Sequence, residues 1–347
     1  PAMRLVRDLI IYSAKHLPHY NPINISGYHI REAGSTAVQE AAFTLANGIA
    51  YVEEVLKKGL AVDDFAPRLA FYFIAERDFF EEIAKFRAAR RVWARIMRER
   101  FGARAPESMR LRFHCQTAGS SLTAKEPLNN IARTALQGLS AVLGAAQSLH
   151  TNGMDEALAI PSELAMKVAL RTQQIILEET GAANSVDPLA GSYFLESLTG
   201  QIEEGIRAYI RRIDDLGGAV AAAEQNFCQM EIADSAYRYQ KHKERGELAV
   251  VGVNRYTDPL GTTEIPIALH EVDRDVEGRQ KQRLAQIKAQ RDSRRVERCL
   301  KELVDVAGTE DNIIPPTIEA VKAYATMGEV VKALRPVFGT YVERPVF

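Results

Sequence analysis

The stretch MRLRFHCQTAG (residues 109–119) reads as a β-strand whose two faces differ in polarity. Side chains alternate between the two faces of a strand. The apolar face carries Leu111, Phe113 and Cys115, and the polar face carries Arg110, Arg112, His114 and Gln116. Parallel strands that are covered by helices are normally almost continuous in Val, Ile and Leu. The polar face of this run therefore needs a partner other than an ordinary core.

Two other strand-like runs, INISGYH (23–29) and AAQSLHTN (145–152), are divided in the same way. Asn24 and Ser26 oppose Ile23 and Ile25 in the first, while Ser148, His150 and Asn152 oppose Gln147, Leu149 and Thr151 in the second. A buried polar group without a hydrogen bond is costly. We therefore expect the three polar faces to line a lumen that holds a large polar ligand. The alternatives are an edge strand that faces water and hydrogen bonds among the polar groups themselves.

These runs, together with PRLAFYFIA (67–75), alternate with helical patterns at about 36–59, 78–100 and 126–143. Strands that alternate with helices at this spacing predict parallel βα units and an α/β fold. Four such units make half of an eight-stranded barrel of the (β/α)₈ type, and an open half exposes two long edges. We therefore expect a second half, supplied by a separate polypeptide or by a preceding segment.

The pattern changes after residue 160, so we expect a half-barrel over 1–160 and a mostly helical region over 161–347. Helices are predicted at about 161–179, 196–215 and 217–225, with a short strand at 249–254. The charged stretch from 274 to 306 balances acids against bases at helical spacing. This pattern favours a solvated or subunit-covering helix over a nucleic-acid-binding arm.

Composition limits the function classes further. Lysine plus arginine (44) nearly equals aspartate plus glutamate (45), which argues against a nucleic-acid binder or a membrane-surface protein. The three cysteines, Cys115, Cys228 and Cys299, are far apart and predict neither a disulfide framework nor a zinc site. No apolar run is long enough to span a membrane. We expect a cytoplasmic chain without a metal site of its own.

The same residues carry a resemblance to a known family. The stretches SGYHIREAG (26–34), DDFAPRLAF (63–71), RFHCQTAGSSLT (112–123), QSLHTNGMDEAL (147–158), DPLAGSYFLE (187–196) and VVGVNRY (250–256) resemble the large catalytic subunit of the adenosylcobalamin-dependent acyl-CoA mutases. The resemblance implies a (β/α)₈ barrel threaded by the pantetheine arm of coenzyme A. The chain would supply strands five to eight of that barrel and the helical region that follows.

His29 is the catalytic residue that the resemblance implies. At the carboxyl end of the first strand, it would donate a hydrogen bond to the thioester carbonyl and assist a radical rearrangement. The residue types alone favour a core histidine satisfied by the backbone, and the SGYH motif reverses that preference. Tyr28 is left open between a contact with the corrin and simple packing.

The resemblance implies a cofactor site near the corrin and adenosyl groups of adenosylcobalamin. Its residues would be Glu32, Gln116, Gly119, Asn152, Glu156 and Ala159. Acids and asparagine at these positions also suit the first turns of helices, where they interact with the helix dipole. The corrin itself would be held mainly by another domain or subunit.

Coenzyme A would be bound by His29, Arg68, Leu69, Ala70 and Gln147. The alternative for Arg68 is a surface ion pair. Three positions depart from the family pattern. Ala70 replaces a common serine, while His19 and Glu107 stand where some members have lysine. These departures affect the binding of coenzyme A rather than the reaction class.

Two parts of the family pattern are missing from these residues: the Thr-Met-Tyr-Arg region of the other half-barrel and the DxHxxG motif of the cobalamin domain. The final GTYVERPVF (339–347) resembles the start of a linker to that domain. We therefore expect a small cobalamin-binding subunit as a partner, and no activity of this polypeptide alone. The leading function is isomerisation of methylmalonyl-CoA and succinyl-CoA. The alternatives are the large subunit of a 2-hydroxyisobutyryl-CoA or isobutyryl-CoA mutase, and a non-catalytic half-barrel scaffold.

Overall fold

The computed structural model describes residues 1–258 and 267–342, and its centre is one four-stranded parallel sheet. The strands β1 (Asn24–Ser26), β2 (Ala70–Ala75), β3 (Phe113–Thr117) and β4 (Ser148–His150) lie side by side in chain order. The prediction of parallel βα units is therefore confirmed, although each strand is shorter than the run that predicted it. The sheet is open, with β1 and β4 as its two edges.

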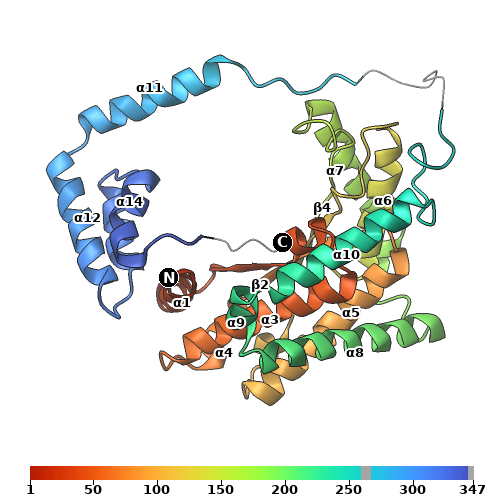
Figure 1. Cartoon of the computed structure of the whole chain (residues 1–347), viewed down its shortest axis with the longest axis horizontal. Helices are drawn as coiled ribbons and strands as arrows, with labels where there is room; N and C mark the ends of the chain where they lie inside the picture. Colours follow the sequence, from red (N-terminus) through yellow and green to blue (C-terminus); the bar gives the residue numbers. More distant parts are fainter. Residues whose placement is uncertain (259–266, 343–347) are drawn as a thin grey trace.

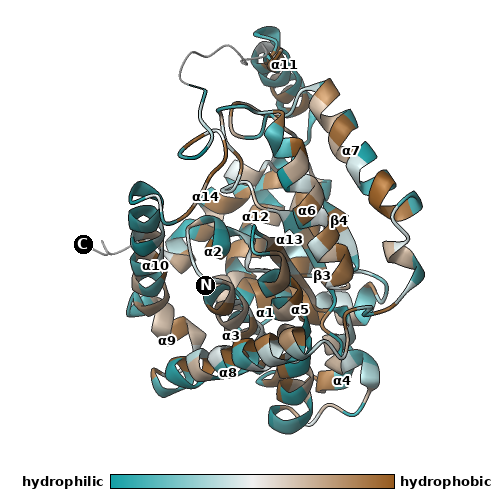
Figure 2. Ribbon diagram, turned by 90° about the vertical axis from the view of Figure 1, so that its right-hand side faces the viewer, coloured by the Kyte–Doolittle hydropathy of each residue, from teal (hydrophilic) through white to brown (hydrophobic). Residues whose placement is uncertain are grey.

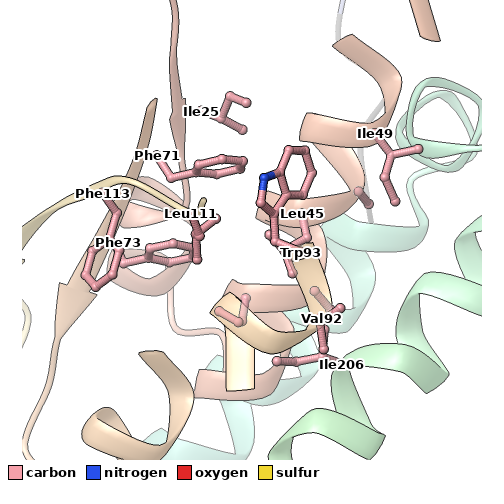
Figure 3. Packing of buried hydrophobic residues seen from close by; sticks show 14 of the residues in the cluster. Ile25, Leu45, Ile49, Phe71, Phe73, Val92, Trp93, Leu111, Phe113 and Ile206 are labelled. Atoms are coloured by element: carbon pink, nitrogen blue, oxygen red, sulfur yellow. The ribbon is translucent and has the colours of Figure 1, made fainter. Parts of the chain in front are cut away.

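The apolar face of the sheet packs against the helices that connect its strands. These are α3 (Ala37–Leu56), α5 (Phe79–Arg95) and α6 (Asn129–Leu143). Phe71, Phe73 and Phe113 point from the strands toward Leu45 of α3 and Trp93 of α5 (Figure 3). All five side chains are nearly inaccessible to solvent. This layer fixes the register of the strands, because a slip by one residue would exchange the two faces.

Side-chain caps define where the two long connecting helices begin. Thr36 accepts a hydrogen bond from Gln39 N, and the Gln39 side chain accepts from Thr36 N, which forms a capping box at α3. Asp78 accepts from Glu81 N at the start of α5. α5 continues beyond Arg95 into a π-helical turn over Ile96–Arg100. The helices predicted over 36–59 and 78–100 are thus confirmed with slightly shorter ends.

The region after residue 160 is mostly helical, as predicted. It contains α7 (Glu163–Glu178), α8 (Tyr193–Asp215), α9 (Ala219–Glu224) and α10 (Phe227–Glu244), the last of which was not predicted. α8 packs across α3 and α5, and its buried isoleucines, Ile202, Ile206, Ile210 and Ile213, belong to the same apolar cluster as the sheet. The helical region is therefore built partly onto the core formed by the βα units.

The strand predicted over 249–254 is wrong. These residues form a turn that Asn254 organises: its Oδ1 accepts from Val250 N at 2.6 Å, and its Nδ2 donates to Leu248 O at 2.8 Å. Gly252 has a φ of +77° within this turn, a conformation that disfavours a continuous strand. The apolar run VVGV resembled a strand, but its local hydrogen bonds are those of a turn.

The charged stretch 274–306 is two helices rather than one. α11 (Asp275–Gln290) ends before Asp292, whose side chain accepts from Arg295 N at 3.0 Å and so caps α12 (Ser293–Ala307). α11 has no buried residue and lies apart from the rest of the molecule in Figure 1. The solvated helix expected here is therefore confirmed for α11. The linker predicted at the end of the chain falls partly outside the described residues.

The last helices form a small bundle beside the N-terminal helix. α12 packs with α13 (Ile314–Lys322) and α14 (Met327–Phe338), and Figure 1 shows this bundle next to α1 (Ala2–His16). Arg4 of α1 donates to Ala307 O at 2.7 Å and to Asp311 O at 3.0 Å. The bond to Ala307 O caps the carboxyl end of α12, where cations are favourable. No helix in the described ranges is long and apolar enough to cross a membrane.

Candidate active site

A row of polar side chains crosses the face of the sheet opposite the apolar core. The strand register places Ser26 beside Tyr72, Tyr72 beside His114, and His114 beside Ser148. The His114 Nδ1 is hydrogen-bonded to Ser148 Oγ, and the rings of Tyr72 and His114 have their centroids 4.9 Å apart. Sequence reasoning did not single out Tyr72. Its alternation with Phe71 and Phe73 is the signal that could have placed it on the polar face.

Gln116 is the centre of a hydrogen-bond network at the carboxyl end of the sheet. Its Nε2 donates to Tyr28 OH at 2.9 Å and to Asn152 Oδ1 at 2.8 Å. Its Oε1 accepts from the hydroxyl of Tyr72, whose ring stacks on Tyr28 with the centroids 5.0 Å apart. The structure thus joins residues from all four predicted strand regions. Tyr28 is a member of this network, and its contact with the corrin stays a prediction.

Glu32 ties α2 (Tyr28–Glu32) to the loop that follows β3. Its two carboxylate oxygens accept from Gly119 N and Ser120 N, each at 2.8 Å. Burial raises the pKa of Glu32, and these two backbone bonds act in the opposite direction. A Cβ on Gly119 would lie 3.3 Å from Glu32 Oε2 and 3.5 Å from Tyr28 OH. Glycine therefore permits the close approach of these groups.

His29 lies in the first turn of α2 and not on the first strand, so the prediction of its place on that strand is wrong. The strand ends at Ser26, and the next residue, Gly27, lies against α3: a Cβ on Gly27 would lie 2.3 Å from Thr44 Oγ1. His29 is solvent-exposed in this chain, and its Nδ1 lies 3.4 Å from Ser26 Oγ. Partial burial lowers the pKa of the imidazole from 6.5. Because Ser26 belongs to the polar row, His29 borders the same space.

The residues after β4 divide into a buried one and two accessible ones. Asn152 is 2% exposed, and its Nδ2 donates to Thr117 O at 2.9 Å while its backbone N donates to Thr117 Oγ1 at 3.0 Å. Its side chain therefore supports Gln116. Glu156 is half-buried, and burial raises the pKa of its carboxyl. Ala159 is also half-buried, in the turn before α7.

The residues expected to bind coenzyme A, other than His29, lie at the opposite, amino end of the strands. Arg68 ends a 3₁₀ turn directly before β2, and Ala70 is the first residue of that strand. The Leu69 side chain is 2% exposed and packs in the core, which leaves only its backbone for a ligand. Gln147 is exposed, and its Oε1 accepts from Phe113 N at 2.7 Å. Apart from His29, the two groups of predicted residues thus lie on opposite sides of the polar row, toward the two ends of the strands, and a six-residue strand is roughly 20 Å long.

No group of three or more His, Cys, Asp or Glu in the described ranges has an arrangement that would hold a metal ion. The polar face carries hydrogen-bond donors and acceptors near both ends of the strands, and the rings of Tyr72 and His114 lie between them. This arrangement suits a long polar ligand more than a compact ion.

Comparison with known proteins identifies the family. The family model described as methylmalonyl-CoA mutase matches residues 1–340. The chain belongs to the methylmalonyl-CoA mutase family. The mutase resemblance that the sequence motifs carried is therefore confirmed over nearly the whole chain.

Individual mutases align with the chain along its full length. It is 56% identical to the 2-hydroxyisobutanoyl-CoA mutase large subunit of Aquincola tertiaricarbonis, over 100% of this chain and 62% of that protein. It is 46% identical to the methylmalonyl-CoA mutase of Rhizobium meliloti (strain 1021), over 99% of this chain and 48% of that protein. The Escherichia coli (strain K12) methylmalonyl-CoA mutase is 42% identical, over 99% of this chain and 48% of that protein. The chain thus spans between 48% and 62% of the length of these relatives.

Proposed function

We propose that this chain is the catalytic part of a coenzyme B12-dependent acyl-CoA mutase, which isomerises the carbon skeleton of a branched acyl-CoA. The observation that carries the proposal is the polar row from Ser26 to Ser148. Arg68 and Gln147 lie on the side of this row toward the amino ends of the strands, and the network around Gln116 lies on the side toward their carboxyl ends. A scaffold without catalysis would not need an aligned polar face that ends in an exposed histidine.

The four-stranded sheet is, in this proposal, half of a (β/α)₈ barrel that another segment or chain completes. Two features support it. β1 and β4 are open edges, which proteins normally pair or cover. α7 carries brown, hydrophobic stretches in Figure 2, and five of its large apolar side chains are exposed: Leu164, Met166, Leu170, Ile175 and Leu177. A second half-barrel would cover both the edges and exposed apolar side chains of α7.

The residues at the carboxyl end of the sheet fit adenosylcobalamin. Gly119 leaves room beside Glu32, Ala159 is small, and Glu156 presents a half-buried carboxylate that is suited to ribose hydroxyls. In this proposal Glu32, Gln116, Gly119, Glu156 and Ala159 border the cofactor, and Asn152 holds Gln116 in place. When bound, the cofactor supplies the radical chemistry of the rearrangement. A small cobalamin-binding subunit would hold most of the corrin, a role consistent with the printed name of the Aquincola relative, a large subunit.

His29 acts on the thioester in this mechanism. Its lowered pKa keeps the imidazole neutral at pH 7, and Ser26 lies at Nδ1. A hydrogen bond from the Ser26 hydroxyl to Nδ1 leaves the Nε2–H to donate to the thioester carbonyl while the acyl group migrates. The stacked rings of Tyr28 and Tyr72 close the polar row beside it and exclude water from the reacting atoms.

Two substrates are the leading candidates. Methylmalonyl-CoA, which converts to succinyl-CoA, is the substrate printed in the names of most of the relatives compared. 2-Hydroxyisobutyryl-CoA is the second candidate, because the relative with that activity in its name is 56% identical, against 46% for the Rhizobium enzyme.

The test is an isomerase assay of the complete complex. The chain is purified with the segment that supplies the other half-barrel and with the cobalamin-binding subunit, and adenosylcobalamin is added. Each acyl-CoA is then incubated separately, isobutyryl-CoA included, and the products are identified by mass spectrometry and NMR. We expect one branched acyl-CoA to be isomerised with a radical signal in electron paramagnetic resonance. Absence of both the product and the signal for every substrate would refute the mutase proposal.

A further inference from the structure

A buried network of ion pairs joins α2 to α3 and α5, and it takes no part in the steps proposed above. Lys85 of α5 is 0% exposed, and its ammonium forms ion pairs with Glu40 at 2.6 Å and with Glu82. Glu82 Oε1 accepts in turn from Arg31 Nη2 of α2, at 3.4 Å. Two carboxylates therefore balance two cations in a region where an unpaired charge would be strongly destabilising.

This network replaces a missing piece of strand. Ile74 of β2 donates its N–H to Glu40 Oε1 at 2.8 Å, and its carbonyl accepts from Lys85 Nζ at 2.7 Å. The backbone groups of alternate residues in a strand point to the same neighbour, and Tyr72 O accepts from Gly27 N at 2.7 Å. The polar groups of Ile74 therefore face the β1 side, where the strand has already ended. The side chains of Glu40 and Lys85 supply the acceptor and the donor that a longer β1 would supply.

The early end of β1 is what allows α2 to form at this place. α2 has five residues, too few for a stable isolated helix, so its position depends on what it contacts. The Arg31 side chain of α2 donates hydrogen bonds to Glu82 of α5 and, at 2.5 Å, to Ser35 O in the loop that follows α2. His29 and Glu32 project from the same short helix toward the polar row and the loop after β3.

We propose that Lys85, with Glu40 and Glu82, is a positioning residue of the mutase site: it completes the hydrogen bonding of Ile74 and anchors Arg31, and so holds α2 with His29 and Glu32 in their working positions. The inference rests on the proposed function. Burial acts to lower the pKa of Lys85, but the carboxylates of Glu40 and Glu82 outweigh it and raise that pKa, so the ammonium stays charged.

The test compares two cations of the same helix in the complete complex. Lys85→Met removes the buried ammonium group at the centre of the network. Arg87→Met, on another face of α5, removes hydrogen bonds to Asp187, Glu196 and Thr199. For Lys85→Met we expect kcat to fall about 10- to 100-fold with KM nearly unchanged, because a small displacement of a catalytic group has effects of this size. Hydrogen–deuterium exchange of the amides of residues 27–34 should rise. Arg87→Met should leave kcat and this exchange at the wild-type level.

A milder variant covers the case in which Lys85→Met does not fold. Glu82→Gln keeps both bonds to Ile74 but removes the ion pairs to Arg31 and Lys85. We expect the same rise in exchange over residues 27–34, with a smaller fall in kcat. Wild-type exchange over these residues in a folded variant would overturn the inference. Because exchange does not depend on turnover, this result is distinct from failure of the proposed function, which would appear as an inactive wild-type complex.

Discussion

His29 takes its protonation state from its surroundings. Partial burial lowers the pKa of the imidazole below its ordinary 6.5, and nearby Ser26 contributes a hydroxyl rather than a charge. A neutral imidazole is both a donor and an acceptor, so it can bond to Ser26 and to a ligand at once. The predictions at the scale of single residues follow from this neutral state.

Replacement of His29 by alanine should remove acid assistance and leave the cofactor-binding residues intact. We expect kcat to fall by about 10²–10⁴-fold, the range typical of general acid catalysis. Binding of adenosylcobalamin, followed by its absorption spectrum, should match that of wild type. Unchanged turnover would exclude His29 from the mechanism. His16→Ala, in α1, is the matched control and should leave turnover unchanged.

The dependence of kcat on pH should show that neutral His29 is the active form. Because its folded-state pKa is lowered from 6.5, His29 is already neutral at pH 7, and raising the pH further does not change it. We expect the ratio of wild-type kcat to His29→Ala kcat to be constant between about pH 7 and 8 and to decline only below the ordinary histidine pKa. A ratio that falls as the pH rises through this range would identify imidazolium as the active form instead.

At the scale of elements, the turn from β1 into α2 is the feature that positions the site. Gly27 has a φ of −97°, which any residue can adopt. Glycine is needed here because there is no room for a side chain, and not because of the backbone conformation. A Cβ there would lie 2.3 Å from Thr44 Oγ1 and 3.0 Å from Glu40 Cγ. Both neighbours belong to α3. Thr44 Oγ1 donates a hydrogen bond to Glu40 O at 2.6 Å, so the Thr44 side chain cannot easily move away to relieve the clash.

Gly27→Ala should therefore destabilise the fold by about 1–3 kcal/mol, as overpacking of a close-packed interior does. Chemical denaturation monitored by circular dichroism measures this change. Gly200→Ala is the matched control: Gly200 lies in α8 with no atom within 4 Å of an added Cβ, so the change should be neutral or slightly stabilising. Equal stabilities of Gly27→Ala and wild type would mean that α3 moves away from the turn.

At the scale of the whole molecule, the open sheet edges and the exposed apolar side chains of α7 predict a second half-barrel. Leu164 and Leu170 are 61% and 54% exposed on this helix. The double variant Leu164→Gln and Leu170→Gln should leave the fold of this chain unchanged, because neither side chain contributes to its core. We expect it to weaken association with the segment that supplies the other half, measured by co-purification and analytical ultracentrifugation.

Val186→Gln is the control for this experiment, since Val186 is 91% exposed in the loop before α8. It should not affect association. If the α7 variant associates as tightly as wild type, the other half-barrel does not pack on α7, and the proposed closure of the barrel would need a different contact.

The amino-acid sequence by itself determined the parallel βα order and the polar face of the sheet. Both depend on local periodicity: alternation along strands such as Phe113–Thr117 and helical spacing between them. The same locality explains the errors. VVGV looked like a strand although Asn254 closes it into a turn, and His29 was placed on a strand that ends three residues earlier.

Only the tertiary structure decided how α2 is held and what meets at Gln116. Lys85 and Glu40 are 45 positions apart in the sequence, and no local pattern shows that they stand in for a strand residue beside Ile74. Tyr28 and Gln116 are 88 positions apart. Periodicity reports which face a side chain occupies relative to its neighbours in the chain. Which distant side chain satisfies a given buried hydrogen-bonding group depends on packing, because those groups find partners only when the helices and the sheet come together.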